Sequence, residues 1–333
     1  MKVTITHDGK DYKAFSVLLS QDKGKPYFAL AAKILSEAHP IKGFRPGQAP
    51  FDVVVKILPP SQVYQEVAAQ IVTKVAPEVI NGREINRLGD PLIEFKELQQ
   101  GKDIEFSISL ALWPTITLPD YRNITVDQKK SEATDKELGE ALEYLKQARN
   151  AQTIDDAFAQ SLGKFADVAA LKTSIREGIV YDKTAMAQEQ ARAALLEKIR
   201  KQVSIELAPF LIEREAQKII ESEIAQLRES NIALPDYLKK IGKSEQEFIE
   251  QTRELAKARL ENALLINEIA KHENLQIPEQ EVQERITRLL ARFANPKQAQ
   301  QHYDPRTLQA RVYQQLLEEK IFGQILDRQI TIN

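Results

Sequence analysis

Residues 43–50 read Gly-Phe-Arg-Pro-Gly-Gln-Ala-Pro, and this stretch decides how the rest of the chain is interpreted. Two glycines and two prolines in so short a run exclude a helix interior or a central strand and predict an exposed turn. The turn presents one aromatic ring, Phe44, and one guanidinium, Arg45, and no acidic residue lies between Glu37 and Asp52. A basic, acid-free loop with an aromatic side chain suits docking on a phosphate-rich surface, whereas the alternative is an ordinary surface turn.

The segments around this turn predict a compact α+β unit over residues 1–115. Residues 2–19 read as two strands around a turn, and residues 92–112 read as a hairpin in which apolar and polar residues alternate. We expect one helix over residues 26–38 and another after Ser61, where an apolar residue recurs every four positions. The β-branched residues of 52–58 favour a strand.

From about Thr134 onward the composition becomes that of a helical domain. Glycine becomes rare, and Ala, Leu, Ile, Glu, Lys, Gln and Arg dominate. Prolines and a glycine separate the expected helices from one another. These helices cover residues 135–150, 155–162, 167–203, 209–230, 244–272, 279–294 and 305–328.

The turn resembles the ribosome-docking tip of trigger factor, a family of bacterial chaperones that meet nascent chains at the ribosomal exit tunnel. The family tip reads Gly-Phe-Arg-Lys-Gly-Lys-x-Pro. Pro46 and Gln48 stand where the family has lysines, so we expect docking that is weaker or altered in register. Further resemblance lies at residues 155–163, 208–215 and 275–279. The tip positions that match are Gly43, Phe44, Arg45, Gly47 and Pro50.

The resemblance covers nearly the whole chain and implies an α+β N-terminal domain followed by an all-α, multi-helix C-terminal domain with protruding arms. It implies a ribosome-binding-like domain at residues 1–115, an extended linker at 116–133 and a helical chaperone domain at 134–333. For residues 52–58 the resemblance favours a short helix over a strand, and we adopt the helix. Binding to the large ribosomal subunit near the tunnel exit is assigned to Lys42, Gly43, Phe44, Arg45 and Gly47.

Most trigger factors insert a prolyl-isomerase domain of the FK506-binding type between the linker and the arms. Here residues 127–155 run from the linker through one expected helix and leave no room for a domain of about 100 residues. The glycine-poor sequence that follows offers no second candidate. The resemblance is therefore to a trigger factor that lacks the isomerase domain.

The overall composition limits which kinds of partner and which cellular compartment we expect for the protein. The 333 residues carry a net charge of −2, but residues 1–60 hold nine Lys and Arg against five Asp and Glu, a mildly basic front that fits a nucleic-acid-facing end. The chain has no cysteine, which excludes disulfides, thiol catalysis and cysteine metal sites. No apolar run approaches a membrane span and the N-terminus reads as strand and turn, so we expect a soluble cytoplasmic protein without membrane contact.

The sequence contains no recognisable motif for catalysis or nucleotide binding. Its four histidines have no metal-ligand spacing, and no glycine-rich phosphate-binding loop occurs. We therefore expect an ATP-independent holdase that binds unfolded or nascent polypeptides. This interpretation assigns no catalytic residue, no metal and no cofactor, and it predicts that the protein is not an enzyme.

Client binding should rest on apolar side chains that line the space between helical arms, although aromatic residues at helical spacing usually belong to a core. Two alternatives remain open. The lost tip lysines point to a ribosome-independent holdase or assembly chaperone, and the family points to a cryptic peptidyl-prolyl isomerase. The sequence does not determine the oligomeric state, so a homodimer is kept as an option. The candidate client-binding side chains are Phe210, Phe248, Phe293, Tyr303, Tyr313 and Phe322.

Overall fold

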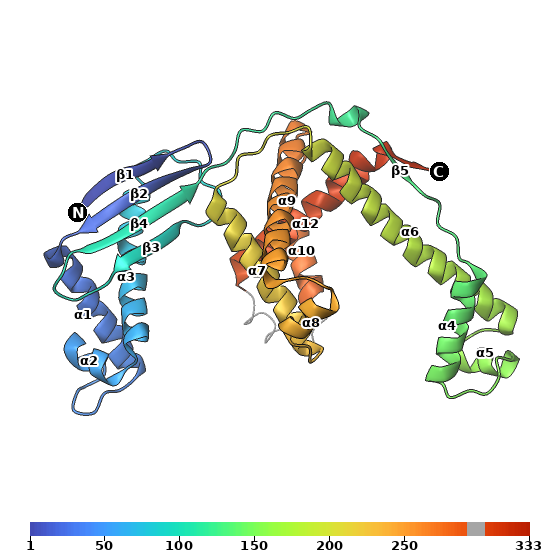
Figure 1. The fold of residues 1–333 in the computed structure, drawn as a ribbon, viewed down its shortest axis with the longest axis horizontal. Helices are drawn as coiled ribbons and strands as arrows, with labels where there is room; N and C mark the ends of the chain where they lie inside the picture. Colours follow the sequence, from blue (N-terminus) through green and yellow to red (C-terminus); the bar gives the residue numbers. More distant parts are fainter. Residues whose placement is uncertain (292–303) are drawn as a thin grey trace. The chain divides into compact units, whose positions relative to one another are not determined.

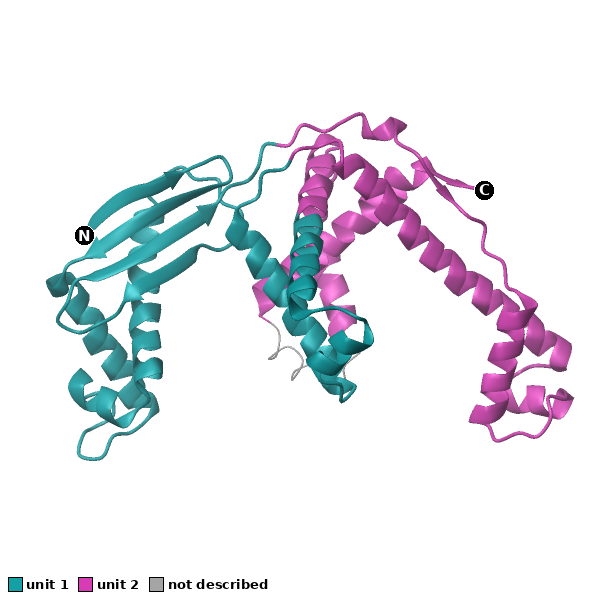
Figure 2. Cartoon of the chain, in the orientation of Figure 1, with its two compact units in different colours: residues 1–115, 205–260 teal, residues 116–204, 261–333 magenta. Residues whose placement is uncertain are grey.

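The computed structural model describes residues 1–291 and 304–333, and the chain separates into two compact units (Figure 2). The first unit holds residues 1–115 and 205–260, and the second holds residues 116–204 and 261–333. A small α+β region followed by a helical region confirms the predicted fold class. Residues 205–260, which we expected in the helical domain, group with residues 1–115 instead.

The first unit is built on a four-stranded antiparallel sheet in the order β1-β2-β4-β3. Along β4, Ile104, Phe106 and Ile108 alternate with less buried residues and face one side of the sheet. Helices α1 (Gln21–Ala38) and α3 (Pro60–Ile80) cover that side (Figure 1). The strands are β1 (Lys2–Asp8), β2 (Tyr12–Leu19), β3 (Leu92–Glu97) and β4 (Ile104–Ala111), which confirms both predicted strand pairs.

The apolar side chains that recur every four residues along α3 form much of this core. Each of its periodic apolar side chains is no more than 2% exposed and packs in the cluster between helices and sheet. These side chains are Val63, Val67, Ile71, Val75 and Val79. The short helix α2 (Phe51–Ile57) adds two more buried side chains, so the predicted helix is confirmed and the strand suggested by β-branching is wrong.

Helix α1 begins at Gln21, upstream of the predicted start at residue 26. The Asp103 carboxylate, from the turn between β3 and β4, accepts a hydrogen bond from the Gln21 main-chain N–H at 2.8 Å and so satisfies one free donor of the first turn. Gly24 lies in the same stretch, where an added Cβ would come within 2.7 Å of Ile104 Cδ1. The glycine therefore allows the helix to approach the sheet closely.

Prolines lie in the first turn of two helices that the sequence interpretation placed differently. α3 starts at Pro60 and not after a Ser61 cap, because proline has no N–H to leave unsatisfied at the first helical position. The short helix α8 (Leu234–Lys240) carries Pro235 in its first turn, where a helix break was expected. Both corrections follow from the tolerance of the first helical turn for proline.

Residues 205–260 contribute α7 (Pro209–Glu229), α8 and the first part of α9 (Glu245–His272) to the first unit. The Phe210 ring meets the Tyr12 ring of β2 edge to face, with ring centroids 5.9 Å apart. Arg214 donates a hydrogen bond of 3.0 Å to the main-chain oxygen of Asp90. These contacts join the start of α7 to the sheet and account for the grouping of the two stretches.

The second unit has its own core, formed by the end of α9 and the helices that surround it. Leu195, Ile199 and Leu265 are fully buried in this core. The further helices described in this unit include α4 (Asp135–Ala148), α5 (Asp156–Leu162), α6 (Val168–Arg200), α10 (Glu279–Leu290) and α12 (Pro305–Gln324). The helix predicted over residues 279–294 is observed as α10, which ends at Leu290 with Ala291 as its C-cap, and residues 292–294 lie outside the described ranges.

The end of the chain differs from the single helix predicted for residues 305–328. α12 ends at Gln324, and a short 3₁₀ turn, η2 (Leu326–Gln329), follows it. The last strand, β6 (Ile330–Ile332), pairs in parallel with β5 (Val126–Gln128). The two strands are far apart in sequence, so no local pattern signals their pairing.

The first turn of α4 is held by a network that links it to α6. The Thr134 hydroxyl accepts a hydrogen bond from Glu137 N, and the Glu137 carboxylate accepts one from Thr134 N at 2.9 Å, which makes a capping box. Lys183 of α6 donates to the same carboxylate at 2.8 Å. The Lys183 ammonium, with the Thr134 donors, lowers the pKa of Glu137 to about 2.

We expect the contribution of Glu137 to stability to disappear in acid. Because its pKa is lower in the folded than in the unfolded chain, the contribution is complete above about pH 4.5 and is lost as the pH falls toward 2. Thermal unfolding of the wild-type chain and Glu137→Gln, which keeps an amide at the cap, measures this. The two melting temperatures should converge in that window, and a constant difference would contradict the role of the carboxylate.

Helix length and apolar content also bear on membrane insertion. Within residues 1–291 and 304–333, no helix is both long and apolar enough to cross a bilayer.

Candidate functional site: the 42–50 loop and the apolar surfaces

The docking loop, which we define as residues 42–50, connects α1 to α2 and is shaped by two glycines. Gly43 has φ +92° and Gly47 has φ +76°, in the left-handed region that favours glycine. Two turns close the loop, since Phe44 N donates to Ile41 O at 3.1 Å and Gln48 N donates to Arg45 O at 3.0 Å. The backbone of the loop is thus defined by its own hydrogen bonds.

Burial alternates with exposure along the docking loop. Ile41 and Ala49 are each 5% exposed and anchor it in the core of the first unit. Phe44 is 41% exposed, and Lys42 and Arg45 are exposed as well. Within the described residues, neither cation forms an ion pair or a side-chain hydrogen bond, so both charges are available to an external partner.

The docking loop is not free of acidic groups in space, although it is in sequence. The Glu37 carboxylate, from the last turn of α1, lies beside Gly47, where an added Cβ would be 2.6 Å from Glu37 Oε1. The sequence interpretation missed this neighbour because the contact depends on how the loop folds back on α1. Gly47 is therefore favoured by its φ, and any side chain at this position would also displace the Glu37 carboxylate.

The predicted client-binding residues that the structure describes differ in burial and are divided between the two units. Phe322 is 2% exposed, with the Arg192 guanidinium 4.9 Å from its ring, so it belongs to the core of the second unit, and we correct its assignment. Phe210 and Phe248 are half-buried, and Tyr313 is 39% exposed. Phe293 and Tyr303 lie outside the described residues.

The first unit carries an apolar surface on α7 and α9, which we call the α7–α9 hairpin. This surface extends beyond the six predicted client-binding residues. Leu255 of α9 is 46% exposed, and several isoleucines of α7 are only half-buried. The isoleucines of α7 recur at helical spacings of four residues, as at Ile220 and Ile224, and of seven residues, as at Ile212 and Ile219, and this pattern could have revealed the face from the sequence. The half-buried isoleucines are Ile212, Ile219, Ile220 and Ile224. In the second unit, Tyr144, Tyr181 and Met186 are 72%, 75% and 64% exposed.

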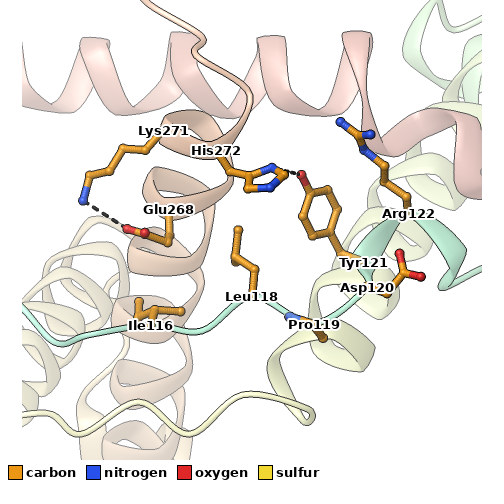
Figure 3. Close-up of a pocket in the computed structure, with 9 residues that line it drawn as sticks. All are labelled: Ile116, Leu118, Pro119, Asp120, Tyr121, Arg122, Glu268, Lys271 and His272. Atoms are coloured by element: carbon orange, nitrogen blue, oxygen red, sulfur yellow. Dashed lines mark hydrogen bonds and ion pairs between the residues drawn. The ribbon is translucent and has the colours of Figure 1, made fainter.

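A cavity of about 700 Å³ in the second unit, the linker pocket, lies between residues 116–122 and the end of α9 (Figure 3). Tyr121 is 3% exposed, and its hydroxyl lies 2.9 Å from His272 Nδ1 and donates a hydrogen bond to the Glu273 carboxylate. Burial and this carboxylate raise the pKa of Tyr121 to about 12. The hydrogen bond from Tyr121 and that from Arg122 lower the pKa of Glu273.

The linker pocket is therefore held by polar groups that already have partners. Arg122 also donates to the Glu273 carboxylate, at 2.6 Å, and Lys271 pairs with Glu268 at 3.0 Å. These contacts fix the linker against α9 and leave a cavity with an apolar wall and a paired polar rim. Among the described residues, no group of three or more His, Asp or Glu side chains is placed to hold a metal ion.

Comparison with known families decides the identity. The pattern of the family described as "Bacterial trigger factor protein (TF)" matches residues 1–145, and that of its C-terminus matches residues 167–327. The chain belongs to the trigger factor family. Between the two matches lie residues 146–166, which hold the end of α4 and α5, so the chain has no room there for an isomerase domain.

Individual relatives agree with this assignment. The trigger factor of Saccharopolyspora erythraea is 23% identical, and the match covers 88% of this chain and 82% of that protein. That of Thermomicrobium roseum is 20% identical over 98% of this chain and 86% of that protein. That of Caldicellulosiruptor bescii is 34% identical over 41% of this chain and 31% of that protein.

A solved trigger factor structure shares the fold. It comes from "Promiscuous Substrate Recognition in Folding and Assembly Activities of the Trigger Factor Chaperone", with a TM-score of 0.51, 14% identity, and coverage of 99% of this chain and 100% of that chain. The family assignment makes this protein a chaperone of the trigger factor type.

Proposed function

We propose that this protein is an ATP-independent holdase that docks on the large ribosomal subunit near the tunnel exit and binds nascent or unfolded chains in the cytoplasm. The observation that carries the proposal is the docking loop, whose buried ends and two left-handed glycines present Phe44 and Arg45 to solvent. An exposed aromatic ring beside an unpaired guanidinium can fill an apolar niche and bind phosphate or carboxylate together.

The apolar surfaces support the client-binding half of the proposal. The α7–α9 hairpin and the exposed Tyr144 and Tyr181 present apolar area that the described core does not cover. Scattered exposed side chains of this kind give many weak contacts, which suits brief binding of clients that differ in sequence. Binding through a large apolar contact area needs neither a nucleotide nor a catalytic residue.

The decisive experiment uses an unfolded client whose slow refolding phase is prolyl isomerisation. Without ATP, a stoichiometric amount of the purified chain should suppress aggregation of the client, because its exposed apolar surfaces cover those of the client. The slow phase should keep its rate at any substoichiometric amount, because no residue is assigned to isomerase chemistry. Light scattering and refolding kinetics measure the two effects.

The two readouts separate the proposed function from its alternatives. Unchanged aggregation for every client tested would contradict the chaperone itself. A faster slow phase at substoichiometric protein would instead establish the cryptic peptidyl-prolyl isomerase. Substitution of an exposed polar residue on the same helix, such as Gln226→Ala on α7, should leave the suppression unchanged, because it removes no apolar surface.

A ribosome-independent holdase is the second candidate, and two features of the docking loop favour it. Pro46 and Gln48 replace the two lysines of the family tip, and the Glu37 carboxylate lies beside Gly47. Both features reduce the positive charge that the loop offers to phosphate. Co-sedimentation with ribosomes separates this candidate from the first, since only the ribosome-docking form should pellet with them.

A further inference from the structure

Residues 116–118 have the sequence and burial pattern of a strand but no partner strand. Ile116 and Leu118 are half-buried, whereas Thr117 between them is exposed, which is the two-residue period of an extended chain. Isoleucine and threonine also favour strands. The segment nevertheless belongs to neither of the sheets in the described parts of the chain.

The main-chain groups of this segment are unpaired. Among the described residues, none forms a hydrogen bond with the N–H or C=O of Ile116, Thr117 or Leu118. In an extended chain the groups of Thr117 point to one edge, and those of Ile116 and Leu118 point to the other. The segment therefore presents unpaired main-chain N–H and C=O groups at its edges. Another extended chain can pair with these groups as a neighbouring strand.

The linker pocket adjoins this segment. Ile116 and Leu118 contribute to its wall, and Glu268, Lys271 and His272 of α9 line the opposite side (Figure 3). A cavity of about 700 Å³ is large enough to receive the side chains of a short peptide. A strand paired with residues 116–118 would direct alternate side chains toward the pocket and the others toward solvent.

We propose that residues 116–118 and the linker pocket bind an extended segment of an unfolded polypeptide by main-chain pairing, as an added strand. This inference rests on the proposed holdase function and assigns one of its client sites. Main-chain pairing recognises any extended chain, because every residue except proline offers the same N–H and C=O groups. The pocket then favours a client segment with an apolar side chain at alternate positions.

Because the charged side chains around the linker pocket are paired, the site does not select clients by their charge. Lys271 pairs with Glu268 at 3.0 Å and Arg122 with Glu273 at 2.6 Å, so neither sign of charge dominates. The Tyr121 hydroxyl donates to Glu273 and lies 2.9 Å from His272 Nδ1, so it already has partners on both sides. The apolar wall and the unpaired main chain thus remain the selective elements.

The first test asks whether main-chain donors of a client are needed. The probe is a short fluorescein-labelled peptide in which valine alternates with serine and lysines flank both ends, titrated with the full chain. Two further peptides carry N-methyl groups on either the odd or the even residues. One methylated peptide should bind roughly tenfold or more weakly and the other nearly as well as the parent, because only one edge faces residues 116–118. Equal binding of all three peptides would overturn the proposal.

The second test locates the peptide on the wild-type chain and needs no variant. Amide hydrogen exchange of the full chain, with and without saturating parent peptide, should slow at one or more of Ile116, Thr117 and Leu118. Unchanged exchange at all three amides would also overturn the proposal. Glu268→Trp, which fills the pocket, should weaken binding, whereas Glu268→Gln should not, and equal effects of the two would exclude the pocket as part of the site.

Aggregation assays on the same proteins keep the two proposals distinguishable. A chain that suppresses aggregation but shows neither edge-specific binding nor slowed exchange would retain the holdase function and lose this site. A chain that fails to suppress aggregation would contradict the holdase function, while the peptide titration and the exchange data would still decide whether the strand site exists.

Discussion

Phe44→Ala combined with Arg45→Ala should abolish co-sedimentation of this protein with ribosomes. Both side chains are exposed on the docking loop, and each contact of the hot-spot type is worth about 2 kcal/mol or more. Together they amount to about 4 kcal/mol, so their joint loss should weaken binding by roughly 1,000-fold. The melting temperature should change little, because neither side chain belongs to the core of the first unit.

The matched control is Ile5→Ala combined with Lys10→Ala. It also removes one exposed apolar side chain, 57% exposed in β1, and one exposed cation, from the turn after β1, within the same unit. This control should pellet with ribosomes like the wild-type chain. If the loop variant still pellets at moderate salt, or if both variants lose binding equally, the docking loop is not the docking site.

The salt dependence of docking gives a second measure of the same site. Lys42 and Arg45 are the cations of the docking loop, so few counterions are released when it binds phosphate. The logarithm of the binding constant should fall with the logarithm of salt concentration with a slope of about −2 or shallower. A much steeper slope would mean that basic residues elsewhere in the chain carry the docking.

The fold was predictable wherever a local pattern and the packing agree. The four-residue period of α3 and the alternation along β4 both face the core they predicted. The docking loop was predictable for the same reason, because Gly43 and Gly47 mark left-handed positions within a short proline-containing segment. In these places the residue type alone restricts the backbone.

The errors lie where a distant residue decides the structure. The start of α1 depends on Asp103, which accepts the hydrogen bond of Gln21, and on Gly24, which makes room for Ile104. A glycine near a helix start reads as a turn when its packing partner is unknown. The pairing of β5 with β6 likewise joins two three-residue segments that lie about 200 residues apart in the sequence, so neither segment indicates its partner.

The candidate sites were predictable to different degrees. The docking loop is local, whereas Glu37 reaches it only through the fold of α1. The client candidates were chosen by residue type, and burial separates Phe322, in a core, from Tyr313, which is exposed. The linker pocket had no sequence signal, because Tyr121 and His272 meet only when the linker lies along α9.

Arg200→Met should destabilise the second unit by about 3–5 kcal/mol. Arg200, at the end of α6, pairs at 2.8 Å with Glu261 of α9, and Glu261 is only 7% exposed. Removing the guanidinium leaves a buried carboxylate without a partner, and its lost hydration is then uncompensated. Denaturant unfolding followed by far-UV circular dichroism measures the loss as a shift of the transition assigned to this unit.

Two further variants decide whether the unpaired carboxylate causes that loss. The double variant Arg200→Met with Glu261→Met removes both charges and should recover most of the stability, because two apolar side chains can replace a buried pair. Lys201→Met breaks a neighbouring pair with Glu197 at 2.7 Å whose side chains are 69% and 52% exposed. It should cost no more than about 1 kcal/mol. If Arg200→Met costs no more than Lys201→Met, the pair does not hold α6 against α9, and the packing of Leu195, Ile199 and Leu265 alone fixes the two helices.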